Sequence, residues 1–149
     1  PFEIALQFVP KRSRFYERTA DMLEMVPESS DWLEAYEKIN GKYGTYGHCL
    51  IYQETGMLIN AMKFAQDTGE GICIAVSQGA DTDCYGEIAG SLLGAYFGPD
   101  GLEDRWIDVF NDDFRVGLAW FSERSLKKVA ERMGKLPALT EKQLSEQEG

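Results

Sequence analysis

The segment from Gln78 to Gly98 reads Q-G-A-D-T-D-C-Y-G-E-I-A-G-S-L-L-G-A-Y-F-G, and it is the most informative part of the chain for the fold. Within it, glycines recur at every fourth position, at Gly86, Gly90, Gly94 and Gly98. In an α-helix this spacing places them on one inclined ridge about 18 Å long. Because a glycine costs roughly 0.5–1 kcal/mol relative to alanine inside a helix, close approach of another backbone must offset the ridge. We predict a helix over 83–98 that forms the buried spine of a helical bundle.

Two carboxylates, Asp81 and Asp83, stand at the beginning of this predicted helix. Aspartates at a helix N-terminus most often cap free backbone N–H groups, and capping is the simpler interpretation here. The alternative is a site for a hard cation, because Mg²⁺ prefers oxygen ligands and two carboxylates that leave a glycine-bounded turn can converge. Thr82 would add a hydroxyl or brace the turn. Cys84 is a poor magnesium ligand because its thiolate is soft, so further ligands must come from elsewhere.

Helical periodicity also predicts helices outside this stretch. Their ranges are 13–26, 31–41, 50–65, 72–77 and 106–110, with one or two helices over 113–133. Asp31 followed by Glu34 is typical of a capping box, and Gly41 is expected to end that helix. Residues 6–9 are the best candidate for a strand. The predicted fold class is nevertheless all-α.

Several single residues have a structural interpretation that we prefer to a functional one. The small apolar Cys73 is expected in the core, as are the three tryptophans, Trp32, Trp106 and Trp120. The only histidine, His48, is expected to be a capping or hydrogen-bonded residue, with ligand contact as the alternative. Glu87 is expected to be salt-bridged or on the rim of a site rather than catalytic.

The composition excludes several classes of protein. With 149 residues and 44% apolar residues, the chain is long enough for one globular domain. Its 15 basic and 25 acidic residues give a net charge of −10, which argues against nucleic-acid binding through a basic surface. No apolar run is long enough for a membrane span, and no signal peptide is expected. Three cysteines without a C-x-x-C pair favour a reducing compartment, and we expect a cytoplasmic location.

The stretch G-A-D-T-D-C-Y-G-E-I-A-G-S-L-L-G-A-Y-F-G resembles the C-terminal signature of the ADP-ribosylglycohydrolase family, in a branch with D-T-D-C. The resemblance extends over roughly residues 10 to 134. It is carried further by Gly47-His48, Gly69-Glu70-Gly71 and Ile74-Ala75-Val76 upstream, and by Arg105-Trp106, Asn111-Asp112 and Arg132 downstream. The D-T-D helix is the specific part of this match.

This resemblance implies an orthogonal helical bundle of the ADP-ribosylglycohydrolase type. The chain would be the C-terminal part of such a domain over residues 1–136, followed by a polar tail over 137–149. The implied activity is cleavage of an N- or O-glycosidic bond of ADP-ribose by a protein that holds a pair of magnesium ions. An acidic chain needs such a local cation to accept the diphosphate of ADP-ribose.

The resemblance also implies roles for individual residues. Asp81 and Asp83 would be metal ligands, and Cys84 stands where many members have a Ser or Thr hydroxyl ligand. The residues expected near the substrate are Gly79, Thr82 and His48. The family's other acidic ligands lie in an N-terminal motif of Ser or Thr followed by two Asp, which residues 1–60 do not contain. The chain would therefore share its metal site with the N-terminal half of the same fold, and no catalytic acid or base is placed within it.

Two alternatives to this activity stay open. The chain is then either a non-enzymatic relative that keeps the fold as a binding or structural protein, or a hydrolase of another N-glycosidic substrate such as a nucleoside derivative. The thiol at Cys84 and the missing acidic motif favour the first of these alternatives.

Overall fold

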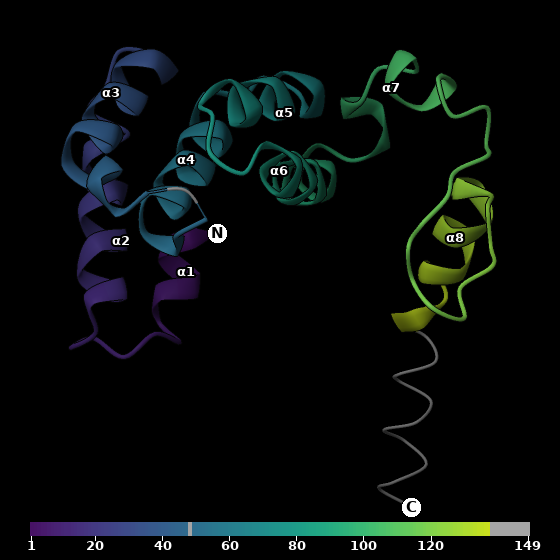
Figure 1. The fold of residues 1–149 in the computed structure, drawn as a ribbon, viewed down its shortest axis with the longest axis horizontal. Helices are drawn as coiled ribbons and strands as arrows, with labels where there is room; N and C mark the ends of the chain where they lie inside the picture. The colour runs from purple at the N-terminus through teal and green to yellow at the C-terminus, as the bar shows by residue number, and fades with distance from the viewer. Residues whose placement is uncertain (48, 138–149) are drawn as a thin grey trace, which may run out of the picture. The chain divides into compact units, whose positions relative to one another are not determined.

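The computed structural model describes residues 1–47 and 49–137, and this part of the chain contains helices and no strand (Figure 1). The all-α fold class is thereby confirmed. The α-helices are α1 (Phe2–Leu6), α2 (Arg14–Met25), α3 (Trp32–Tyr43), α4 (Ile51–Phe64), α5 (Thr68–Ser77), α6 (Thr82–Phe97), α7 (Arg105–Asp108) and α8 (Leu126–Met133), with 3₁₀ turns η1 (Gly44–Tyr46) and η2 (Pro99–Gly101). His48 and the polar tail from 138 onward lie outside the described residues.

The chain divides into two compact units, Pro1–Glu103 and Asp104–Gly149. The first unit contains α1 to α6, and the second contains α7 and α8. The predicted division into a domain over 1–136 and a tail over 137–149 stays a prediction. Among the helices of the described part, none combines the length and the apolar character that a membrane crossing requires.

Helix α4 is the centre of the first unit. It packs against α2, α3, α5 and α6, and Figure 1 shows it between the α2–α3 pair and the α5–α6 pair. Two apolar clusters flank it, one shared with α2 and α3 around Met22 and Ile39, the other shared with α5 and α6 around Ile74 and Leu93. The burial of α4 on several faces makes it the scaffold on which the other helices are placed.

Helices α5 and α6 run antiparallel and pack closely. The row of glycines on α6 predicts this close approach, but only some of these glycines face α5. A Cβ atom on Gly86 would lie 3.4 Å from Val76 Cγ1, and one on Gly90 would lie 3.3 Å from Ile72 Cδ1. A Cβ atom on Gly94 would meet nothing within 4 Å. Gly86 and Gly90 therefore face α5, whereas Gly94 does not contact a neighbouring helix.

The prediction that this helix is the buried spine of the bundle is wrong. The buried residues of α6 are Tyr85, Ala89 and Leu93, which form a single row beside the glycines. On the other side Ile88 is 41% exposed and Tyr96 is 71% exposed. Glycine spacing reports how closely a helix approaches one neighbour, but it does not report how many neighbours surround the helix.

An aspartate caps the beginning of α3 and another caps the beginning of α5, and only the first of these caps was predicted. Asp31 Oδ1 accepts the backbone N–H of Glu34 at 2.9 Å, which confirms the predicted cap of α3. The helix then runs through Gly41 and ends at Tyr43. Asp67 makes the same bond to the N–H of Glu70 at 2.7 Å, and so α5 begins at Thr68, four residues before its predicted start.

The predictions for the two ends of the chain were less accurate. Residues 6–9 do not form a strand, because Leu6 closes α1 and turns follow it. Of the region 113–133 only α8 is helical. The segment before it folds back on itself through a bond from Phe114 N–H to the carbonyl of Arg124 at 2.9 Å. Trp120 has a positive φ of 65° and is fully exposed, and Cys73 is exposed on α5, so neither is a core residue.

Candidate metal centre

The turn that joins α5 to α6 brings the two predicted ligands to the beginning of α6. Gly79 has a φ of 79° and Ala80 a φ of 64°, so two successive residues adopt the left-handed conformation. This conformation is open to glycine but uncommon for alanine. The turn reverses the chain within a few residues, and it places Asp81 at the N-cap position of α6.

The capping interpretation does not account for Asp81, because its side chain makes no capping hydrogen bond. Its Oδ2 atom instead accepts a hydrogen bond from the Cys49 thiol at a distance of 3.5 Å. Cys49 belongs to the loop before α4, so the carboxylate of Asp81 is directed toward a neighbouring segment. The side chain of Asp81 is therefore available for a role other than capping the beginning of α6.

Asp83 lies on the exposed first turn of α6, within hydrogen-bond reach of Asp81. The hydrogen bond with the Asp81 carboxyl, together with the backbone N–H groups of Asp83 and Cys84, holds the pKa of Asp83 below its ordinary value. The two carboxyl groups thus converge, as a shared ligand pair requires.

A third carboxylate, Glu54, approaches this pair from the first turn of α4. Burial and then the negative charge of Asp81 raise its pKa, although the backbone N–H groups of Cys49 and Leu50 counteract part of the shift. Its Oε1 atom is buried and has no hydrogen-bond partner. Glu54 was not predicted as a site residue, and its one signal in the sequence is its place in the first turn of a helix that follows a glycine loop.

The two nearby thiols report the same negative potential. The pKa of Cys49 is raised, first by its hydrogen bond to Asp81 and then by the charge of Asp81. The pKa of Cys84 is raised by partial desolvation and by the charges of Asp81 and Glu87. Thiols in such surroundings stay protonated at neutral pH, and the local field favours a cation.

The loop that carries Cys49 is braced from two sides. The guanidinium of Arg18 lies over the ring of Tyr46 at 4.3 Å and over the ring of Tyr52 at 3.9 Å. Gln53 Nε2 donates to the carbonyl oxygen of Gly47 at 2.5 Å. These contacts connect α2 and α4 to the loop, and they hold Cys49 beside Asp81.

The donor set fits magnesium in kind but not in number. Asp81 and Asp83 offer hard oxygen atoms, whereas Cys84 offers a soft sulfur where a hydroxyl would be expected. In the part of the chain that the structure describes, no group of three or more His, Cys, Asp or Glu side chains is arranged to hold a metal ion. These residues therefore amount to part of a coordination shell.

The other predicted site residues are distributed as follows. Gly79 and Thr82 flank Asp81, and Thr82 is exposed on the first turn of α6. His48 lies outside the described residues. Glu87 is exposed one turn beyond Asp83, as a rim residue would be. The structure thus brings Cys49 and Glu54 to the predicted aspartates, and neither had been predicted as a site residue.

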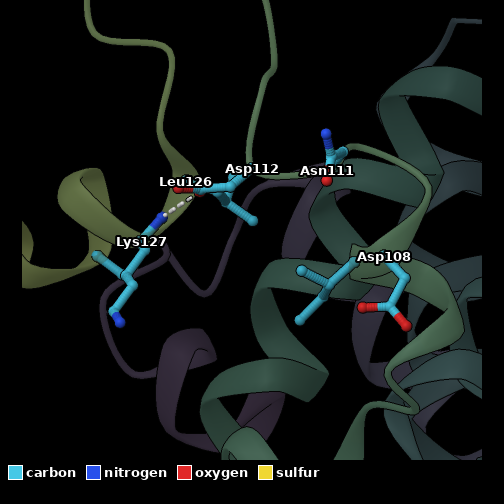
Figure 2. A pocket seen from close by; sticks show the side chains of 7 residues that line it. Asp108, Asn111, Asp112, Leu126 and Lys127 are labelled. Atoms are coloured by element: carbon cyan, nitrogen blue, oxygen red, sulfur yellow. Dashed lines mark hydrogen bonds between the residues drawn. The ribbon is translucent and has the colours of Figure 1, made fainter.

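A separate hollow of about 730 Å³ lies within residues 104–137 (Figure 2). Asp112 is its central acidic residue, and Figure 2 shows the backbone N–H of Lys127 donating to it, at 3.1 Å. The second carboxylate oxygen of Asp112 accepts the hydroxyl of Ser125 at 2.7 Å. These bonds hold the pKa of Asp112 below its ordinary value and tie it to the beginning of α8, so its role is structural. The hollow is lined by Ile107, Asp108, Asn111, Asp112, Leu126, Lys127 and Ala130.

Comparison with known families identifies the family of the chain. The profile of the ADP-ribosylglycohydrolase family matches residues 2–144, which is nearly the full length of the chain. The search of curated proteins found no match, and neither did the search of solved structures. On the strength of this match and of the all-α fold, the chain belongs to the ADP-ribosylglycohydrolase family.

Proposed function

We propose that this protein hydrolyses an ADP-ribosyl glycosidic bond in a magnesium-dependent reaction and that the chain contributes the C-terminal half of the metal site. Family membership supports the reaction class. The observation that carries the assignment of the site is the pairing of Asp81 with Asp83, because Asp81 takes no part in capping its own helix. The remaining ligands would come from the N-terminal half of the same fold.

Asp81 and Asp83 would hold the ion, or one of a pair of ions, at the beginning of α6. Bound magnesium supplies positive charge for the substrate diphosphate and a Lewis acid for the ribose hydroxyls. The chain's own residues orient this site: the left-handed turn at Gly79 sets the position of Asp81, and the braced loop brings Cys49 against it. Glu54 adds negative charge behind the aspartates, which strengthens the attraction for a cation.

The experiment that tests this function replaces each aspartate in the full-length protein. Asp81→Asn and Asp83→Asn keep the side-chain size but remove the charge that binds the cation. We expect each to lower the rate of release of ADP-ribose from ADP-ribosylated protein by about a hundredfold or more, with a matching loss of magnesium affinity by calorimetry. Asp100→Asn, in the exposed turn η2, is the matched control and should retain both. Full activity in both site variants would refute the metal site.

A second candidate function is that of a non-enzymatic relative that binds a ligand or partner. One observation favours it: Cys84 offers a soft sulfur where the family pattern has a hydroxyl. Magnesium binding no tighter than that of Asp81→Asn would support this candidate. Hydrolysis of another N-glycosidic substrate is tested with a panel of ADP-ribose and nucleoside compounds in the same assay.

The free thiols of the chain bear on the cellular compartment of the protein. The three cysteines are free thiols, with Cys49 and Cys84 beside the aspartates. Because exposed thiols persist in a reducing environment, we propose a cytoplasmic location. The proposed partner is an ADP-ribosylated substrate, and the proposed reaction requires neither a nucleic acid nor a membrane.

A further inference from the structure

Two buried amide side chains, Asn60 and Gln78, bond to each other, and Gln78 directly precedes the turn that carries Asp81. Asn60 is 0% exposed and Gln78 is 2% exposed. Asn60 Nδ2 donates to the carbonyl oxygen of Trp32 at 2.8 Å and to Gln78 Oε1 at 2.8 Å. Gln78 Nε2 in turn donates to the carbonyl oxygens of Met57 at 3.0 Å and Ile74 at 3.2 Å. The two amides form a continuous chain of hydrogen bonds through the core of the first unit.

The orientation of both amides follows from the groups at the two ends of this chain. Trp32 at one end, and Met57 and Ile74 at the other, offer carbonyl oxygens, which can only accept. Each NH₂ group must therefore face a carbonyl oxygen, and Gln78 Oε1 must face Asn60. Asn60 Oδ1 is left buried without a partner. A buried oxygen without a partner lowers stability, so this pair of amides is not arranged for stability alone.

Gln78 stands at the point where α5 ends and the left-handed turn begins. It is the C-cap residue of α5, and Gly79 and Ala80 with their positive φ values follow it directly. A non-glycine residue such as Ala80 persists in this conformation only where the surrounding structure constrains it. Gln78 supplies that constraint, because its side chain ties the beginning of the turn to Met57 and Asn60 of α4.

We propose that Asn60 and Gln78 are positioning residues that hold the turn, and through it Asp81, at the metal site. The inference rests on the proposed function in assigning Asp81 to the metal. Neither amide touches the aspartates, so their effect passes through the backbone of residues 79–81. The amide chain connects α3, α4 and α5 to that backbone, and thus the packing of the bundle sets the place of the ligand.

The test removes the hydrogen bonds of Gln78 without removing its volume. Gln78→Met retains a long unbranched side chain but cannot donate or accept as the amide does. We expect amide hydrogen exchange at residues 79–83 to accelerate about tenfold or more, and magnesium affinity of the full-length protein to fall about tenfold. Ile39→Val, in the other apolar cluster, is the control for general destabilisation: it should leave the affinity unchanged and should not single out the turn. If Gln78→Met does not fold, Gln78→Asn, which retains the amide one methylene shorter, replaces it.

The outcomes separate this proposal from the proposed function. If wild-type protein binds magnesium and Gln78→Met behaves like Ile39→Val in both measurements, the positioning role is overturned and the proposed function stands. Faster exchange in the turn with unchanged magnesium affinity also overturns it, because the turn would then be held for another purpose. Wild-type protein that binds magnesium no better than Asp81→Asn overturns the proposed function itself, and the positioning role with it.

Discussion

The Sγ atom of Cys49 lies 3.5 Å from Oδ2 of Asp81, although the two residues are 32 positions apart in the chain. This contact joins the loop before α4 to the turn before α6. Glu54 approaches the same carboxylate from the first turn of α4, so the site is built from the starts of two helices. A mutation in either segment should therefore affect the other.

The close packing of α5 against α6 predicts opposite effects for two glycine substitutions. A Cβ on Gly71 would overlap Leu93 Cδ1 and would lie 3.0 Å from Ala65 Cβ, and Leu93 is fully buried. Gly71→Ala should therefore lower the free energy of unfolding by about 1–3 kcal/mol. Gly94→Ala, where nothing lies within 4 Å, should raise it by roughly 0.5–1 kcal/mol through helix propensity. Urea denaturation of both variants checks the pair, and equal effects would contradict the packing.

Glu54→Gln should stabilise the folded chain at neutral pH. Burial and the charge of Asp81 raise the folded-state pKa of Glu54 above its ordinary value of 4.5. A group with a raised folded pKa contributes its full stability below the unfolded pKa and loses it as the pH rises through the folded pKa. Wild type should lose stability relative to Glu54→Gln over that interval, as measured by thermal unfolding from pH 4 to 8. Glu37→Gln, on the exposed face of α3, is the control, and an identical profile for the two variants would argue against the assignment.

Cys84→Ser should strengthen magnesium binding in the full-length protein. The substitution replaces a soft sulfur by a hard oxygen of similar size at a position that the family pattern gives to a hydroxyl ligand. We expect calorimetry to show a severalfold gain in affinity. Cys73→Ser alters an exposed thiol on α5, away from the aspartates, and should leave the affinity unchanged. A weaker site in Cys84→Ser would exclude residue 84 as a ligand position.

The contacts of Glu34 at the beginning of α3 are expected to make the free energy of unfolding fall in acid. The hydrogen bond from Lys38, followed by the bonds from Ser30, lowers the pKa of Glu34 from 4.5 to about 2. Because the folded-state pKa is depressed, this stabilisation is present above pH 4.5 and is lost as the pH falls toward 2. Glu34→Gln should flatten the acid limb of a thermal unfolding profile in this interval. An unchanged slope would show that the exposed contacts of Glu34 do not contribute in solution.

Helix positions were predicted well where the deciding interactions are local. The predicted ranges 50–65 and 83–98 differ from α4 and α6 by one residue at each end, because a helix is defined by contacts between residues three or four apart. The cap at Asp31 was predicted for the same reason. The prediction for residues 113–133 was wrong outside α8. Apolar periodicity shows which side of a helix would pack, but it does not show whether a partner is present.

Sequence patterns alone predict the all-α class, the cap that begins α3 and the two aspartates at the beginning of α6. Each of these depends on residues close together in the chain. Three features depend on the packing of the helices: α4 and not α6 is central, Cys49 and Glu54 approach Asp81, and Asn60 bonds to Gln78. Asn60 and Gln78 are 18 positions apart in the chain, and Cys49 and Asp81 are 32 positions apart. These features depend on how the helices pack against each other, and no pattern within a single helix specifies that packing.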